Sequence, residues 1–145
     1  MFLGQYSHSV DAKGRLTVPV RFRVALASGA FVTQGFERNL MVYTTDSFER
    51  LAQRATQLTA TDPEVRAVRR VIFGGATEVV LDTAGRILLP PFLRDYAKLD
   101  GETIVVGAGE YFEIWNAEAW NKELQSVMDP ESNARRFANY DLSAG

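Results

Sequence analysis

The 145-residue sequence predicts an α+β fold built from two related copies of one supersecondary unit. The main observation is an internal repeat: residues 10–19 read VDAKGRLTVP, and residues 81–90 read LDTAGRILLP. At an offset of 71 the Asp, Gly, Arg and Pro coincide. The similarity continues from Gly35 and Gly107 at an offset of 72, as a one-residue loop insertion would produce. Two such copies most simply pack as a pseudo-symmetric pair.

The first part of each copy has the pattern of strand, tight turn, strand and short helix. Alternating or apolar residues predict strands at 4–10, 15–18, 77–81 and 86–89. The glycine in each turn supplies a positive φ, and the Asp three residues earlier accepts hydrogen bonds from free turn N–H groups. Pro19 and Pro90 then stand where helices begin, because proline needs no N–H partner in a first helical turn. These short helices extend to about Ala27 and Leu99.

The second part of each copy predicts a hairpin followed by an amphipathic helix. β-Branched and aromatic residues place hairpin strands at 30–33, 40–43, 103–106 and 111–115. Apolar residues at helical spacing then predict helices at 46–58 and 117–128. The first copy gains a helix between Thr61-Asp62-Pro63-Glu64 and Gly74-Gly75, and a last helix spans 130–140. We expect copies 1–75 and 76–145 to form one compact body.

The composition excludes several kinds of site. The chain has no cysteine and a single histidine, His8, so disulfides, thiolate zinc sites, cysteine nucleophiles and imidazole metal clusters are absent. We therefore expect no metal and no cofactor. No apolar run approaches the roughly 18 residues of a membrane helix, and the first residues lack the charged region and long apolar region typical of a signal peptide. The expectation is a cytoplasmic protein.

The charge is distributed unevenly along the chain. The net charge of −2 argues at first sight against a nucleic-acid partner. Residues 1–75, however, carry 10 Lys and Arg against 6 Asp and Glu, whereas residues 76–145 carry 6 against 12. An acidic average is therefore no argument against binding a polyanion, since binding depends on a local patch.

Several motifs together resemble one family. They are the opening Phe2-Leu3-Gly4-Gln5-Tyr6, the motif Asp-x-x-x-Arg at Asp11–Arg15 and again at Asp82–Arg86, and Gly35-Phe36-Glu37. One Asp-x-x-x-Arg carries almost no information. Two in register, each with Gly before Arg and Pro four residues after it, are specific. On these residues the sequence resembles the MraZ family of bacterial transcriptional regulators over essentially its whole length.

The resemblance implies a fold and a function. The fold is an AbrB-like swapped-hairpin β-barrel with peripheral helices, in which one chain supplies both halves. The implied function is transcription regulation in the nucleoid: a ring-shaped homo-oligomer binds short direct repeats of double-stranded DNA in the promoter of its own division and cell-wall operon.

The residues expected to contact DNA are basic or lie in the two turns. Arginine suits this task because its planar fork pairs with phosphate oxygens or with O6 and N7 of guanine. The candidate DNA-binding residues are Lys13, Gly14, Arg15, Arg21, Arg23, Gly85, Arg86 and Arg94. Asp11 and Asp82 are expected to stabilise the turns and orient Arg15 and Arg86.

Alternatives remain open at this stage. Asp and Arg beside a hairpin turn often form only a local ion pair. The second turn has Ala84 where the first has Lys13, so the two turns need not contribute equally. His8 is expected to be a surface or partly buried strand residue, and Trp115 and Trp120 core or interface anchors. Some basic residues on the first copy's added helix are expected to form a solvated or subunit-interface face rather than a second DNA patch: Arg66, Arg69 and Arg70.

Two other functions compete with DNA binding. One is a protein-interaction scaffold or antitoxin-like partner that uses the same barrel. The other is an enzyme, which the sequence disfavours because neither a nucleophile with its base nor a metal set is evident.

Overall fold

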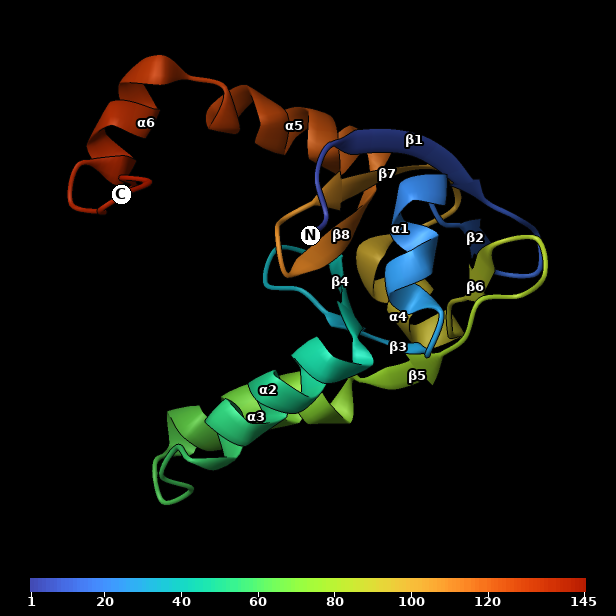
Figure 1. Ribbon diagram of the computed structural model, residues 1–145, viewed down its shortest axis with the longest axis horizontal. Helices are drawn as coiled ribbons and strands as arrows, with labels where there is room; N and C mark the ends of the chain where they lie inside the picture. The colour runs from blue at the N-terminus through green and yellow to red at the C-terminus, as the bar shows by residue number, and fades with distance from the viewer.

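The computed structural model describes all residues, 1–145, and places eight strands in one antiparallel sheet that curves into a nearly closed barrel (Figure 1). The strand order is β5-β3-β4-β8-β7-β1-β2-β6. The strands are β1 (Gln5–Val10), β2 (Arg15–Thr17), β3 (Ala30–Gln34), β4 (Leu40–Thr44), β5 (Thr77–Val79), β6 (Arg86–Leu88), β7 (Gly101–Gly107) and β8 (Tyr111–Asn116). The predicted α+β class and the positions of the strands are confirmed.

The two copies interleave in the sheet. Only β3–β4 and β7–β8 form full hairpins within a copy. The other ladders cross between copies: β1 pairs with β7 over its whole length, β2 with β6, β3 with β5 and β4 with β8. Strands β1 and β2 pair only at Val10 and Leu16. This exchange of strands is the swapped-hairpin arrangement that the family resemblance implies.

Short helices close the barrel. They are α1 (Val20–Arg23), continued by the 3₁₀ turn η1 (Val24–Leu26), and α4 (Pro91–Ala97). Phe22 of α1 is buried against Phe2 and Phe112, with ring centroids 5.0 and 5.1 Å away. Leu93 of α4 belongs to the same cluster of 19 buried residues. Because both copies contribute to this core, burial of its apolar surface holds the halves together.

Two helical arms project from the barrel in different directions (Figure 1). The first consists of α2 (Thr45–Thr56) and α3 (Pro63–Gly74), and the second of α5 (Ala117–Val127) and α6 (Pro130–Phe137). Side chains cap their N-termini, as when Thr44 Oγ1 accepts a hydrogen bond from the Ser47 N–H at 3.1 Å. The first arm packs on the sheet through Met41, Tyr43, Phe48 and Ile72. No residue of α6 is buried, and this helix ends at Phe137, three residues before the predicted end.

Other expectations concern single residues. Trp115 and Trp120 are buried and pack together at 5.3 Å, which confirms their role as core anchors. His8 is half-buried on β1, and its pKa is lowered by burial and by the positive charge of Arg23. No helix has the length and apolar character needed to cross a membrane.

Candidate nucleic-acid interface

The first turn is organised by the carboxylate of Asp11. Its Oδ1 accepts the N–H groups of Lys13 and Arg15 at 3.0 and 2.9 Å. Its Oδ2 accepts Nε of Arg15 at 2.7 Å. The Gly14 N–H closes the turn on the Asp11 carbonyl at 2.9 Å. One carboxylate therefore fixes both the backbone of the turn and the direction of the Arg15 guanidinium.

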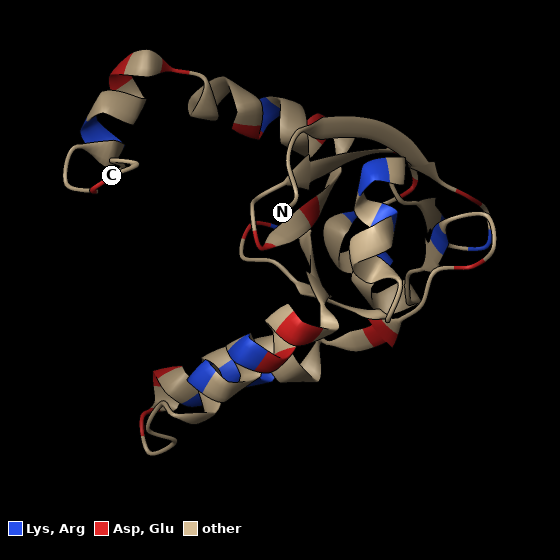
Figure 2. Cartoon of the chain, viewed as in Figure 1, with Lys and Arg blue, Asp and Glu red and all other residues tan.

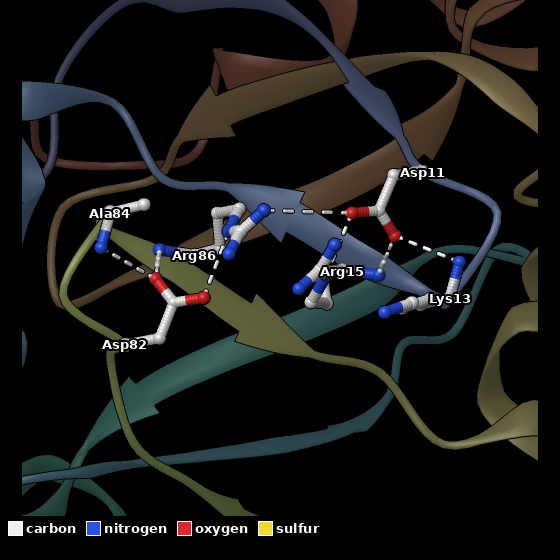
Figure 3. A network of polar contacts seen from close by, with 6 residues as sticks. All are labelled: Asp11, Lys13, Arg15, Asp82, Ala84 and Arg86. Atoms are coloured by element: carbon white, nitrogen blue, oxygen red, sulfur yellow. Dashed lines mark hydrogen bonds and ion pairs between the residues drawn. The ribbon is translucent and has the colours of Figure 1, made fainter.

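The second turn repeats this geometry with its own residues (Figure 3). Oδ1 of Asp82 accepts the N–H groups of Ala84 and Arg86, each at 2.9 Å. Oδ2 of Asp82 accepts Nε of Arg86 at 2.8 Å. The Gly85 N–H donates to the Asp82 carbonyl at 3.0 Å. The repeated sequence motif therefore forms the same hydrogen bonds in both turns.

Pairing between copies brings the two turns together. The β2–β6 ladder places Arg15 opposite Leu88 and Thr17 opposite Arg86. Two further backbone bonds continue it, from the Val18 N–H to the Gly85 carbonyl and from the Leu89 N–H to the Gly14 carbonyl, both 2.9 Å long. The two turns and their arginines therefore lie side by side on one edge of the barrel (Figures 1 and 3).

Each turn glycine is covered by an arginine of the other copy. Gly14 and Gly85 have φ of 85° and 76°, which glycine adopts without strain. A Cβ at Gly14 would lie 2.6 Å from Cζ of Arg94, and one at Gly85 would lie 2.4 Å from Cζ of Arg23. The missing side chains thus allow the guanidinium groups to lie against the turns.

The backbone holds these two covering arginines in place. Nε of Arg23 donates to the Val18 carbonyl at 2.9 Å, and Nε of Arg94 donates to the Leu89 carbonyl at 3.0 Å. Neither guanidinium forms an ion pair within the chain. Sequence reasoning placed these residues among the candidate contacts but missed their packing on the opposite turn. The shared offset of 71 was the only signal, and it does not reveal which turn each arginine covers.

The other two basic candidates are more exposed. The Lys13 side chain extends from the first turn without an ion pair, and Arg21 is exposed on α1. Arg21 forms no hydrogen bond to either turn. The other five of the six predicted cations lie at the turns, where hydrogen bonds hold their backbone or side chains.

The electrostatics of the turns follow from their hydrogen bonds. The backbone N–H of Arg15 lowers the pKa of Asp11, with a further contribution from the Arg15 side chain. The backbone N–H of Arg86 and its side chain act in the same way on the pKa of Asp82. Both carboxylates are therefore charged at neutral pH. Each arginine uses Nε for its Asp, and its Nη groups form no hydrogen bond within the chain, so they can bind planar acceptors.

The charged groups at this edge suit the binding of an anion. No three His, Cys, Asp or Glu side chains lie together as metal ligands do. Figure 2 shows cations at the turns and on α1, although acidic residues interrupt them. The arrangement offers two fixed guanidinium groups with further cations around them, which is suited to a polyanion.

The interleaved sheet and the duplicated turns define a class: a swapped-hairpin barrel whose two halves come from one chain. The family model described as "MraZ protein, putative antitoxin-like" matches residues 1–71 and again residues 72–139. The chain belongs to this MraZ family of transcriptional regulators, which is not a family of enzymes.

Individual relatives agree over nearly the full length. The chain is 47% identical over 140 residues to "Transcriptional regulator MraZ" of Thermomicrobium roseum, covering 95% of this chain and 98% of the relative. It is 46% identical over 129 residues to the protein of that name from Herpetosiphon aurantiacus, covering 89% and 90%. The Moorella thermoacetica protein of that name is 40% identical over 143 residues, covering 98% and 100%. The function of the chain is therefore transcription regulation.

Proposed function

We propose that the chain regulates transcription by binding double-stranded DNA through its two paired turns. The observation that carries this proposal is the β2–β6 pairing, which sets two Asp-oriented arginines side by side. Orienting a side chain before binding reduces the rotamer entropy that binding removes. Arg15 and Arg86 then read bases or bind phosphates, and Lys13, Arg21, Arg23 and Arg94 add phosphate contacts from the first turn, α1 and α4.

The target of this proposal is a set of short direct repeats in the promoter of the chain's own division and cell-wall operon. The family membership supports this target, as does the geometry of assembly. Copies related by rotation around a ring present the same edge at regular intervals and in the same sense, which suits direct repeats better than a palindrome. Each weak contact is then reinforced by its neighbours. Such a protein is located in the nucleoid.

The arms support the proposed ring. Exposed apolar side chains remain on both, including Val68 on α3, Met128 after α5 and Phe137 on α6. The two arms are different surfaces that project in different directions (Figure 1). A contact between the α2–α3 arm of one copy and the α5–α6 arm of the next is therefore heterologous. A heterologous contact generates a ring when the rotation closes.

The experiment that tests DNA binding is a gel-shift titration on the upstream DNA of the operon. Arg15→Ala and Arg86→Ala should each lose about tenfold or more in affinity, the loss of one good arginine contact. Arg70→Ala on α3 removes an equal charge at a distance from the turns and should retain affinity. Light scattering checks that each variant keeps its assembly. Unchanged affinity in both turn variants, with the assembly intact, contradicts the proposal.

The competing function is a protein-interaction or antitoxin-like partner, which the exposed apolar arms also suit. A pull-down from nuclease-treated lysate separates the two. A partner that disappears with nuclease was bridged by DNA. A partner that remains, together with DNA affinity that salt does not change, favours the scaffold.

A further inference from the structure

The internal repeat also creates a pair of equivalent pockets away from the two turns. Each is a pocket between a hairpin turn of one copy and the helix that follows the other copy's hairpin. The first pocket is lined by Thr44, Ser47, Arg50 and Glu110, with Met1, Phe2 and Gly109. The second is lined by Asn116, Ala119, Lys122 and Arg38, with Ala97, Lys98 and Glu118. At an offset of 72, Arg38 corresponds to Glu110, and Arg50 to Lys122.

The two pockets differ in charge and in the segments of the chain that line them. In the first, the lining charges are Arg50, Glu110 and the amino terminus at Met1, and Phe2 lines the pocket with its N–H bonded to the Gly109 carbonyl at 2.8 Å. In the second, no terminal segment of the chain enters, and Glu110 is replaced by a cation, Arg38. The first pocket therefore sets Arg50 and the amino terminus against Glu110, for a net charge of +1, whereas the second carries more positive charge.

Three cations line the second pocket against one carboxylate, Glu118, which gives a net charge of +2. None of Arg38, Lys98 and Lys122 forms an ion pair within the chain. The Arg38 guanidinium lies 5.4 Å from the ring centre of Tyr96, a cation–π contact that holds its plane and leaves its N–H groups available. The cations have no internal partner to displace before they bind an anion.

The backbone has an unusual conformation at two of these three cations. Arg38 and Lys98 are the only non-glycine residues of the chain with positive φ, at 62° and 52°. Lys98 is the C-cap of α4, a left-handed position where glycine is usual. Nδ2 of Asn116 donates to the Lys98 carbonyl at 2.9 Å and ties this cap to the start of α5. The pocket is therefore held by direct contacts between α4 and α5.

We propose that this pocket binds a small molecule carrying a diphosphate or triphosphate group. Its volume of about 450 Å³ lies within the range of small-molecule sites. Two lysine ammonium groups and one planar guanidinium match several phosphate oxygens, and the net charge matches an anion of at least two charges. The pocket shares no residue with the paired turns, and α5 leaves the barrel on the side away from the β2–β6 edge (Figure 1). The proposal thus goes beyond DNA binding and does not depend on it.

The direct test is a titration of the full chain with inorganic pyrophosphate and with ATP at low salt, by calorimetry. The two tryptophans of the chain give a second readout, since Trp115 precedes Asn116 and Trp120 lies on α5. We expect saturable binding of one pyrophosphate per chain, binding of ATP, and none of neutral adenosine. Absence of pyrophosphate binding overturns the proposal.

Matched variants locate the binding. Lys122→Gln should weaken pyrophosphate binding about tenfold or more, as loss of a charge-assisted contact does. Arg50→Gln removes the equivalent cation from the first pocket and should leave binding unchanged. Lys98→Gly should also lose binding while it raises the thermal midpoint, because glycine relieves the left-handed cap. Its loss of binding therefore cannot be attributed to unfolding. Equal loss in Arg50→Gln and Lys122→Gln contradicts the proposal.

Two other occupants are distinguished by the same variants. If Lys122→Gln weakens DNA binding as much as Arg15→Ala and leaves pyrophosphate binding unchanged, the pocket is a DNA contact and the proposal is wrong. If Lys122→Gln changes only the number of subunits in the assembly, an acidic surface of a second copy fills the pocket and the proposal is again wrong.

Discussion

Nη1 of Arg86 lies 3.8 Å from Oδ2 of Asp11, so the arginine of the second turn contacts the carboxylate of the first (Figure 3). The reverse contact, between Arg15 and Asp82, is not formed within 4.0 Å. Asp11 therefore pairs with both arginines, whereas Asp82 pairs only with its own. The pseudo-symmetry of the two turns is broken at this ion pair.

This asymmetry predicts different effects for the two acidic residues. Asp11→Asn removes a charge that orients both arginines, so it should weaken DNA binding more than Asp82→Asn, by a further factor of about three, as expected for one partly exposed ion pair. Both amides keep an oxygen that accepts the turn N–H groups, so the fold should be retained. Gel-shift titrations of the two single variants, with far-UV circular dichroism as the control for folding, measure the difference. Equal losses in affinity would show that the Asp11–Arg86 contact has no effect.

The crossed packing of arginine on glycine predicts the cost of a side chain in the turns. Gly14→Ala and Gly85→Ala each place a Cβ within 3 Å of a guanidinium at positive φ. Each should reduce the free energy of unfolding by about 1–3 kcal/mol. The control is Gly74→Ala, at the end of α3, where a Cβ meets nothing within 4 Å. That substitution should be neutral or stabilising by less than about 1 kcal/mol.

Urea denaturation monitored by tryptophan fluorescence measures these changes. A double-mutant cycle separates the two causes of strain, because Arg94→Ala removes the steric conflict at Gly14 but leaves the strained φ. A smaller cost of Gly14→Ala in the Arg94→Ala background than in the wild type supports contact between Arg94 and the first turn. An equal cost in both backgrounds would mean that the backbone conformation alone explains the loss.

The carboxylates of the turns predict a dependence of stability on acid. The pKa values of Asp11 and Asp82 are lowered in the folded chain, first by backbone hydrogen bonds from Arg15 and Arg86. A lowered pKa means that the charged form stabilises the fold above the ordinary aspartate pKa of about 4 and that this contribution is lost below it. The urea concentration at the unfolding midpoint should thus decrease as the pH is lowered from about 4 to about 2. The double variant Asp11→Asn/Asp82→Asn should show a shallower fall, and an identical slope in both proteins would contradict the assignment.

The sequence predicts the repeat, the elements and the turn chemistry because each depends on residues close together in the chain. Asp, Gly and Arg within five positions suffice to specify the turn around Asp11, and the proline and N-cap signals locate the helices. The partners of the strands could not be obtained in this way. The period of side chains in β1 shows which face is buried, but it does not show that the long ladder of β1 forms with β7 while its pairing with β2 is confined to Val10 and Leu16.

The contacts of the candidate site that sequence reasoning missed all join one copy to the other. The alignment of the copies pairs Arg23 with Arg94 as equivalents, but their positions over Gly85 and Gly14 depend on the exchange of strands. The same holds for the cationic pocket, which combines Arg38 of the first copy with Lys98 and Lys122 of the second. Only the family resemblance carried information about this exchange.

The difference between Lys13 and Ala84 predicts how DNA affinity depends on salt. These residues occupy the same place in the two turns, and only Lys13 offers a charge there. Affinity for DNA should fall steeply with salt, with a slope of log affinity against log salt concentration that counts neutralised phosphates. Lys13→Ala should reduce the magnitude of that slope by about one for each DNA-bound turn, and Ala84→Lys should increase it by the same amount. The exposed Ala84 side chain leaves room for the longer lysine, so this gain does not require repacking. Filter-binding measurements between 50 and 200 mM salt test both changes. If the slope is unchanged in both variants, this position of the turns makes no contact with phosphate, and the DNA lies elsewhere on the barrel.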